Sequence, residues 1–485
     1  MDLNSFIWDK LSFLFLTFAG LYLLILLGGF QLFRFPLWWE KTFGTLFKKE
    51  AKLSSKGSIS PFASLCTSLA ATLGVGNIVG VSSAICIGGP GAVFWMWVAA
   101  FLGMGTSYAE NILGIYFRRK NIGGEWSGGA MYYLEEGLGS VKGFKTIAKC
   151  LAYLFSVFTV LASFGMGSMG QVNKIVLNLT ASFPAGNLKL LRGFTFADFY
   201  PLFLGILLFI LALIACTGGL KQITSFTEKI VPFMIVFFMS GSIYVIIKNA
   251  HNVIPAFKAI FSSAFSFEAG VGGGTGFILG RAFSEGFKRG VFSNEAGLGS
   301  SVIVHASTSL EEPCEQGMWG MFEVFVDTIL LCTVTALVVL TSGAYNLNTN
   351  LFSGSDATLV AEAFNLNFPG RDLGGKFVAI CIFLFSFSTV IGWNHYGAKA
   401  WEYIFGENSV FIFKALHLLS IPLGAVLTSS LAWTVSDIFN GLMMLPNLIA
   451  VIFLSGYVKR ITNNYILRKK KGRNIKPMLS YFKNK

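Results

Sequence analysis

Long apolar runs, separated by short polar stretches, make up most of the chain. Segments 11–33, 200–216 and 318–340 are examples, and each is near the about 20 residues that a helix needs to cross a bilayer. The strands of an outer-membrane barrel would instead alternate apolar and polar residues. The pattern therefore predicts an all-α polytopic membrane protein with about eleven transmembrane helices. We expect these helices at 11–33, 61–86, 90–117, 148–177, 200–216, 224–247, 277–305, 318–343, 373–401, 409–428 and 434–457.

Composition supports this class and excludes several others. Hydrophobic residues make up 54% of the 485 residues, whereas charged residues make up 13%. A soluble globular domain carries about 25% charged residues, so half that amount cannot cover the surface of a soluble protein of this size. A cytosolic enzyme, a secreted domain and a disordered protein are therefore excluded.

Positive charge is unevenly distributed among the predicted loops. Lysine and arginine are concentrated in loops 34–60 and 118–147 and in the tail 458–485, whereas loops 248–276 and 344–372 contain few. With eleven helices, the basic segments all fall on one side, which the positive-inside rule makes cytoplasmic. We expect a multi-pass protein of the cell (inner) membrane with its N-terminus outside and its C-terminus inside. The net charge of +13 then points to anionic lipid, not nucleic acid, as the partner.

A cluster of glycines lies near the middle of the second predicted span. Gly74, Gly76 and Gly80 accompany Thr72 and Asn77 within a few residues. Transporters bind their cargo at discontinuous helices near the midplane, where free backbone amides and carbonyls are available. The cluster favours such a break, and close helix packing through small residues is the alternative.

The seventh predicted span contains a second segment of this kind. Residues 292–300, FSNEAGLGS, place Asn294 beside Glu295 within an apolar span, which is unfavourable without a partner. A loop or a cytoplasmic helix end is the alternative interpretation. Because spans two and seven are five helices apart, the two breaks take equivalent positions in a five-plus-five inverted repeat preceded by one accessory helix.

The predicted helices and the two breaks divide the chain into three parts. Residues 1–60 hold the accessory helix and a cytoplasmic loop, residues 61–457 form a ten-helix transporter core, and residues 458–485 form a basic cytoplasmic tail. Within the core, the first repeat spans 61–247 and the second spans 277–457.

Other features leave alternatives open. Glu323 and Asp327 lie about one helical turn apart on the eighth span, where they could relay a proton, form a hydrogen-bonded pair, or face a vestibule. The stretch from Trp126 to Gly139 predicts a short helix along the cytoplasmic face. No nucleotide-binding loop or hydrolase motif occurs, which argues against an ATP-driven pump or an enzyme. A channel would show repeated pore motifs or rings of charge, and the sequence has neither.

Several motifs carry a family resemblance, in the family's order along nearly the whole chain. They are AATLGVGNIVGVSSAICIGGPGAVFWMWVAAFLGMGTSYAENILGIYFR at 70–118, GGAMYYLEEGLG at 128–139, FGMGSMGQVN at 164–173, TGGLKQITSFTEKIVPFM at 217–234, GFKRGVFSNEAGLGSS at 286–301 and FSFSTVIGWNHYG at 385–397. GGPGAVFWMW and GVFSNEAGLGS are the most specific. The chain resembles the sodium:alanine symporter family (alanine/glycine:cation symporters).

The resemblance implies a LeuT-type fold with one extra helix before the ten-helix core, and it implies a set of binding residues. The implied substrate contacts are Thr72, Gly74, Val75, Gly76, Asn77, Gln171, Phe292, Ser293, Asn294 and Trp393. The implied sodium ligands are the carbonyls of Ala70 and Leu73 and the hydroxyls of Ser388 and Thr389. The first break is expected to bind the substrate carboxylate, because free amides at a half-helix N-terminus suit an anion. Trp393 is expected to close one wall of the pocket.

The chain departs from the family's usual residues at a few positions. It has Val75 in place of Thr, Ser168 in place of Asn, Ala130 in place of Pro, and Asn394-His395 in place of Ser-Tyr. Val75 lacks a hydroxyl close to the expected substrate, so the departures bear on the substrate more than on the fold. We expect sodium-coupled symport of alanine or glycine by alternating access, with proton coupling as the alternative. We expect no enzymatic activity, no cofactor beyond Na+ as coupling ion, and a monomer.

Overall fold

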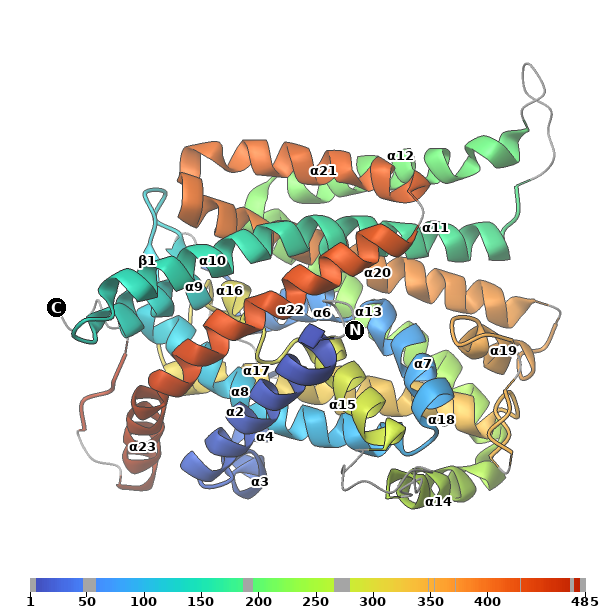
Figure 1. Cartoon of the computed structure of the whole chain (residues 1–485), viewed down its shortest axis with the longest axis horizontal. Helices are drawn as coiled ribbons and strands as arrows, with labels where there is room; N and C mark the ends of the chain where they lie inside the picture. Colours follow the sequence, from blue (N-terminus) through green and yellow to red (C-terminus); the bar gives the residue numbers. More distant parts are fainter. Residues whose placement is uncertain are drawn as a thin grey trace.

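Helices form nearly all of the regular structure. The computed structural model describes residues 6–46, 58–185, 195–265, 280–347, 349–352, 354–370, 372–427, 429–471 and 475–479. Within these residues the only sheet is an antiparallel hairpin of β1 (Arg119–Lys120) and β2 (Trp126–Ser127). Figure 1 shows long helices packed side by side in one bundle, with the hairpin towards the same end as α23 (Ser455–Lys471). The predicted all-α polytopic class is confirmed.

The number of complete spans is smaller than the predicted eleven. Among the described residues, eight helices are long and apolar enough to cross a membrane, or nine if one bent pair counts as a span. The predicted spans 61–86 and 277–305 are absent from this set because the described part of each consists of two shorter helices; residues 277–279 lie outside the described residues. The long helices are Phe6–Leu26, Ala92–Phe117, Lys145–Ser182, Phe196–Cys216, Gly219–Lys248, Pro313–Thr341, Leu373–Phe405 and Glu407–Val426, and the bent pair is Asp437–Phe453 with Ser455–Lys469.

The first of these interrupted spans confirms the predicted break. α6 (Pro61–Thr72) starts with proline in its first turn, and the Ser60 hydroxyl accepts a hydrogen bond from the Ala63 amide at 2.9 Å. The chain is extended at Leu73 and Gly74, makes one 3-10 turn, η2 (Val75–Asn77), and continues as α7 (Val79–Gly88). Residues 73–78 are called the first break.

The second interrupted span is also broken where the sequence indicates. α15 (Arg281–Asn294) ends at Glu295, which has a left-handed backbone with φ of 53°. Gly297 and Gly299 follow with φ of 91° and 77°, values that glycine adopts without strain. Helical structure resumes briefly in α16 (Val302–His305). Residues 295–301 are called the second break.

The accessory helix is shorter than predicted. The expected helix 11–33 is instead a π-helical turn, η1 (Phe6–Ser12), followed by α2 (Phe13–Leu26). Gly28 and Gly29 then take φ of 60° and 64°, which ends the helix and redirects the chain. Shorter helices follow, namely α3 (Phe30–Phe33), α4 (Phe35–Lys41) and α5 (Phe43–Leu46).

The polar stretches contain more structure than predicted. The helix expected from Trp126 to Gly139 is wrong in its first part, because Trp126 and Ser127 form strand β2 and helical structure begins at Ala130. The basic tail is helical through α23, at an angle of 57° to the preceding helix. The remaining elements here are α9 (Ala130–Tyr132), η3 (Tyr133–Gly137), η4 (Leu138–Ser140), α14 (Val253–Ala264) and α19 (Leu359–Asn365).

A long central helix, α20 (Leu373–Phe405), holds the first break in place. It packs against α6, α10 (Lys145–Phe164), α11 (Gly170–Ser182) and α13 (Gly219–Lys248). A Cβ atom added at Gly392 would lie 2.7 Å from the Cβ of Ala71, so the two helices approach each other through small residues. This close approach places the residues one turn before Gly392 beside the end of α6.

The second break lies among the other helices of the bundle. α15 packs against α7 and α8 (Ala92–Phe117), and α8 also packs against α17 (Pro313–Val324). α17 continues without interruption as the π-helical segment η8 (Phe325–Cys332) and as α18 (Thr333–Thr341). The outer helices are α12 (Phe196–Cys216), α21 (Val410–Val426) and α22 (Ser429–Phe453).

Candidate functional site

A cavity of about 260 Å³ lies between the first break and the last turns of α15, just before the second break. Its wall comes from the first break, from α7, from α11 and from the end of α15, and its lining includes Thr72, Gly74, Val75, Gly76, Gln171 and Phe292. These are six of the ten expected substrate contacts. The volume is below the about 300–1,000 Å³ of pockets for drug-sized ligands, which favours a small ligand.

Asn77 and Ser293 lie behind the cavity wall, where they join the two breaks. The Asn77 Oδ1 accepts a hydrogen bond from the Gly74 amide at 3.1 Å, and its Nδ2 donates to the Ser293 hydroxyl at 2.9 Å. Both side chains converge on Asp327: Asn77 Nδ2 donates at 2.8 Å and the Ser293 hydroxyl at 2.7 Å. Thr328 adds a third bond to this carboxylate at 2.7 Å. One fully buried acid therefore ties both interrupted helices to η8.

Sequence reasoning missed this role of Asp327. It paired the residue with Glu323, but no hydrogen bond joins the two side chains, and each has its own partners. The π-helical turn of η8 begins at Phe325, between them, and changes the i, i+4 geometry that the spacing suggested. A signal was available in the unfavourable burial of any carboxylate at this depth, which requires donors nearby.

Asn294 shapes the second break without lining the cavity. Its Nδ2 donates to the Gly290 carbonyl at 2.8 Å and to the Thr328 hydroxyl at 3.1 Å, and its Oδ1 accepts from the Ala296 amide at 3.0 Å. The side chain thus satisfies backbone groups on both sides of the point where α15 ends.

Trp393 is placed away from the cavity lining. It is fully buried, it packs edge-on against Tyr396 with ring centroids 5.5 Å apart, and it lies close to Gly167. A Cβ atom added at Gly167 would lie 2.4 Å from the Cβ of Trp393. Its expected role as a wall of the substrate pocket stays a prediction.

The four expected sodium ligands lie together beside the first break. The Ser388 Oγ is 3.3 Å from the Ala70 carbonyl oxygen, and the Thr389 Oγ1 is 3.1 Å from the Leu73 carbonyl oxygen. Both hydroxyls also donate to the Phe385 carbonyl, at 2.7 and 3.0 Å. A set of uncharged hard oxygens suits a hard monovalent cation.

Gly74 connects this oxygen cluster to the cavity. A Cβ atom added there would lie 3.1 Å from the Thr389 Oγ1 and 3.3 Å from the Gln171 Oε1, so any larger residue would press on both. The Gln171 Oε1 is buried and has no hydrogen-bond partner within the part of the chain that the structure describes. An unpaired acceptor in a cavity wall is available to a ligand that donates hydrogen bonds.

Charged residues at the mouth of the cavity were not predicted. The cavity is also lined by Lys174, Arg289, Asp356 and Asp437, all of them half-buried. The Arg289 guanidinium donates to the Ser83 hydroxyl at 3.3 Å. These residues are far apart in the sequence, and each one taken alone is typical of a charged residue at the membrane interface. The sequence therefore carries no signal that they meet.

Comparisons with known proteins place the chain in a family. The model of the sodium:alanine symporter family matches residues 1–479. The sodium/alanine symporter AgcS of Methanococcus maripaludis is 38% identical over 474 residues, which cover 97% of this chain and 98% of that protein. An uncharacterized transporter of Haemophilus influenzae is 39% identical over 469 residues, 96% of each chain. The Bacillus subtilis protein named "Probable sodium/glutamine symporter GlnT" is 32% identical over 473 residues, 97% of this chain and 91% of that protein.

Among solved structures, a manganese transporter mutant of Eremococcus coleocola is similar at a TM-score of 0.46 and 13% identity, over 85% of this chain and 78% of that one. That likeness is too low to assign a fold. The family match and the relatives, in contrast, cover almost the whole sequence. The chain belongs to the sodium:alanine symporter family.

Proposed function

We propose that the protein is a secondary transporter that carries a small neutral amino acid, alanine or glycine, into the cell together with Na+. One observation carries the proposal: a small cavity lies between the first helix break and the end of α15, and a cluster of four hard oxygens lies directly beside it. Such a site brings the substrate and the coupling ion into contact with the same half-helix.

The substrate's two charged groups have partners in this cavity. The amides of Val75 and Gly76 open the 3-10 turn, where no earlier carbonyl is in register to accept them, so they suit a carboxylate. The free Oε1 of Gln171 suits the ammonium group. Phe292 limits the space for the substrate side chain, while Asn77, Ser293 and Asn294 hold the walls in position from behind.

We expect ion binding and substrate binding to be coupled because the two sites adjoin at Gly74. A sodium ion held by the Ala70 and Leu73 carbonyls and the Ser388 and Thr389 hydroxyls would fix the end of α6. Leu73 is also the first residue of the first break, so ion binding orders the amides that receive the substrate. Substrate and ion then stabilise one another's sites, which is the reciprocal coupling that symport requires.

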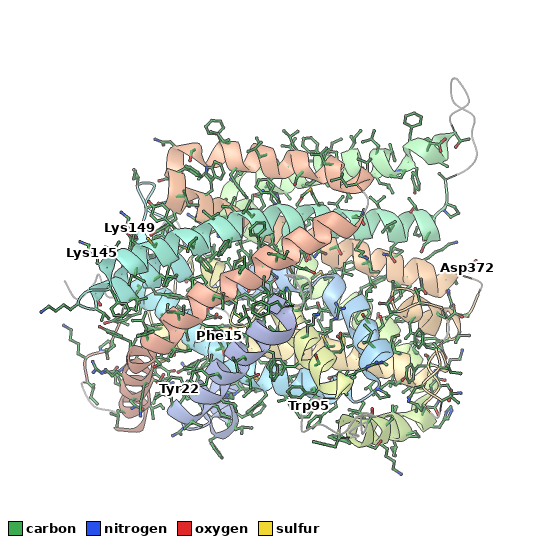
Figure 2. The ribbon with its side chains drawn as sticks, in the orientation of Figure 1. Phe15, Tyr22, Trp95, Lys145, Lys149 and Asp372 are labelled. Carbon is green, nitrogen blue, oxygen red and sulfur yellow. The ribbon has the colours of Figure 1, made fainter. Side chains whose placement is uncertain are left out.

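For the membrane arrangement we propose eleven spans of the LeuT type, counting each interrupted helix once. Lys145 and Lys149 lie at one end of the bundle in Figure 2, and Asp372 lies at the opposite end. The positive-inside rule makes the lysine end cytoplasmic, which places the N-terminus outside and the C-terminus inside in the cell membrane. We propose that a single copy of the chain is sufficient for transport.

In the proposed alternating-access cycle, one side of the cavity is open while the other is closed. The charged residues that mark its mouth come from α11, α15, α22 and the segment before α19, and its wall on this side includes the half-helices α7 and α15. On the other side, the buried Arg118 donates to the carbonyls of Ala306, Thr308 and Leu310 at 2.6–3.0 Å. Transport requires that this second side opens while the first closes.

A reconstituted uptake assay tests the proposal. Purified protein in liposomes should accumulate labelled alanine or glycine when a sodium gradient is imposed, and should not do so with a proton gradient at zero sodium. Accumulation driven by protons alone would favour the alternative, in which buried carboxylates such as Glu295 bind the coupling ion. The Glu295 Oε1 lacks a hydrogen-bond partner among the described residues, so a proton there is chemically reasonable. Glutamine should be included, since one relative is named for it.

Gln171 offers a direct test of the substrate site. Replacing Gln171 with leucine should raise the alanine concentration for half-maximal uptake about 10–100-fold, because a hydrogen bond to a charged group contributes about 1.5–3 kcal/mol. Gln222→Leu is the matched control, since this glutamine lies outside the cavity on α13. Equal half-saturation in both variants would remove Gln171 from the site.

A further inference from the structure

A second polar cluster lies on the other side of the breaks from the cavity mouth. His305 Nε2 is 2.9 Å from the Glu323 Oε2, and the Ser68 hydroxyl donates to the other oxygen of this carboxylate. The second ring nitrogen of His305 contacts the side-chain amide of Gln316, which also donates to the Ser64 hydroxyl at 3.1 Å. All five side chains are buried at 0–1% exposure, and none lines the cavity.

This cluster joins three helices on the side of the breaks that is closed in this structure. Ser64 and Ser68 belong to α6, before the first break, whereas His305 ends α16, after the second break. Gln316 and Glu323 come from α17. The cavity mouth is instead flanked by α7 and α15, so the cluster and the mouth lie on opposite sides of the breaks. Because α6 and α16 are both hydrogen-bonded to α17, an opening that moves them away from α17 has to break or rearrange these bonds.

The cluster is built to hold the imidazole in either protonation state. A neutral ring can accept a hydrogen bond from the amide nitrogen of Gln316, and a charged ring can donate to its amide oxygen after a half-turn of that side chain. The Gln316 Oε1 is buried and has no partner among the described residues, so it is free for the second arrangement. The carboxylate of Glu323 serves either state through the opposite ring nitrogen.

Other buried acidic groups surround this pair. The Glu323 carboxylate interacts electrostatically with the buried carboxyls of Glu110, Glu295 and Asp327 and with the phenol of Tyr396. With one shared proton the pair is neutral overall, as imidazolium with carboxylate or as imidazole with carboxylic acid. Without it the pair adds a net negative charge to an interior that already holds three other acids, and such a charge is unfavourable without water.

We propose that His305 and Glu323 form a proton-binding site, and that the proton held there keeps the α6–α16 side of the transporter closed. The proposal deepens the transport function proposed above and rests on its alternating-access mechanism. Loss of the proton stabilises the open side, where water reaches the pair. Binding of substrate and sodium, which favours the closed arrangement of α6, is therefore accompanied by uptake of a proton.

Calorimetry on the purified full-length protein tests this directly. Alanine is titrated at saturating sodium in several buffers of different ionisation enthalpy, from about pH 5 to 8, the range in which histidine changes charge. The dependence of the binding heat on the buffer counts the protons taken up. We expect up to about one proton per alanine in the wild type, and its loss in Glu323→Gln and His305→Gln. Glu110→Gln, which removes another buried carboxyl, should retain the uptake.

Two results would overturn the proposal: no proton uptake by the wild type at any pH in this range, or uptake that persists in Glu323→Gln. Should Glu323→Gln not fold, Gln316→Leu replaces it, because loss of the amide should shift the pH at which uptake is largest. An absence of any binding heat with alanine, glycine or glutamine would instead count against the proposed substrates. Sodium titrations in the same buffers then show whether ion binding is accompanied by proton uptake.

Discussion

Replacing Thr389 with valine should raise the sodium concentration needed for half-maximal uptake about 10–100-fold. Valine keeps the volume of threonine but removes the hydroxyl that lies 3.1 Å from the Leu73 carbonyl. An oxygen in contact with an ion contributes about 1.5–3 kcal/mol, which corresponds to this range in affinity. Uptake of labelled alanine, measured at graded sodium concentrations, checks the expectation. The maximal rate at saturating sodium should fall less than the affinity.

Ser386→Ala is the control for this experiment. Ser386 lies on the same helix, one turn before Thr389, and its buried hydroxyl has no hydrogen-bond partner among the described residues. Its loss should leave the sodium dependence unchanged. If Thr389→Val shows the wild-type sodium dependence as well, the ion is bound elsewhere, and the buried carboxyls become the candidates for the coupling site.

Sequence reasoning located the two helix breaks because their causes are local. Gly74 and Gly76 weaken a helix by themselves, and the left-handed conformations at Gly297 and Gly299 are ones that glycine permits. The end of the accessory helix was missed although Gly28 and Gly29 cause it, because an apolar run continues past them. Hydropathy indicates whether a segment lies in an apolar environment, but it does not indicate where the chain changes direction.

The grouping of the four proposed sodium ligands was predicted only through the family resemblance. Nothing in the composition or spacing of residues 385–397 shows that Ser388 and Thr389 meet the carbonyls of Ala70 and Leu73, more than 300 residues earlier in the chain. The contact depends on helix packing, in which Gly392 lets α20 approach α6 closely. A single sequence carries no direct record of such a tertiary pairing.

The hydrogen-bond partners of Asp327 were also not predictable from the sequence alone. Its neighbour in sequence spacing, Glu323, suggested a pair, whereas its partners Asn77 and Ser293 come from other helices. A buried acid predicts that donors are present, but it does not predict which ones. The structure identifies them as the side chains that fix both breaks, which makes this carboxylate the most consequential residue outside the cavity.

Replacing Asp327 with alanine should therefore abolish uptake and lower the thermal stability more than any cavity substitution. The change leaves the donors on Asn77, Ser293 and Thr328 without their shared acceptor. A buried donor left unpaired costs about 1–3 kcal/mol. The Asn77 amide loses its shortest bond, at 2.8 Å, and keeps longer ones to the Ser293 hydroxyl at 2.9 Å and to the backbone carbonyl of residue 327 at 3.3 Å. Because Asn77 also accepts from the Gly74 amide, the first break should lose its conformation. Melting temperature in detergent and uptake in liposomes measure the two effects.

Asp327→Asn distinguishes the hydrogen bonds of this carboxylate from its charge. An asparagine keeps the size and one acceptor oxygen, which can face Asn77, while the hydroxyls of Ser293 and Thr328 can rotate to accept from the new amide. It loses the extra strength of bonds to a charged group, which contribute about 1.5–3 kcal/mol against about 0.5–1.5 for neutral ones. The expected order of stability is wild type, then Asp327→Asn, then Asp327→Ala. Wild-type stability in Asp327→Ala would show that the two breaks are held by packing alone. Loss of uptake in Asp327→Asn at near wild-type stability would give the charge itself a part in transport.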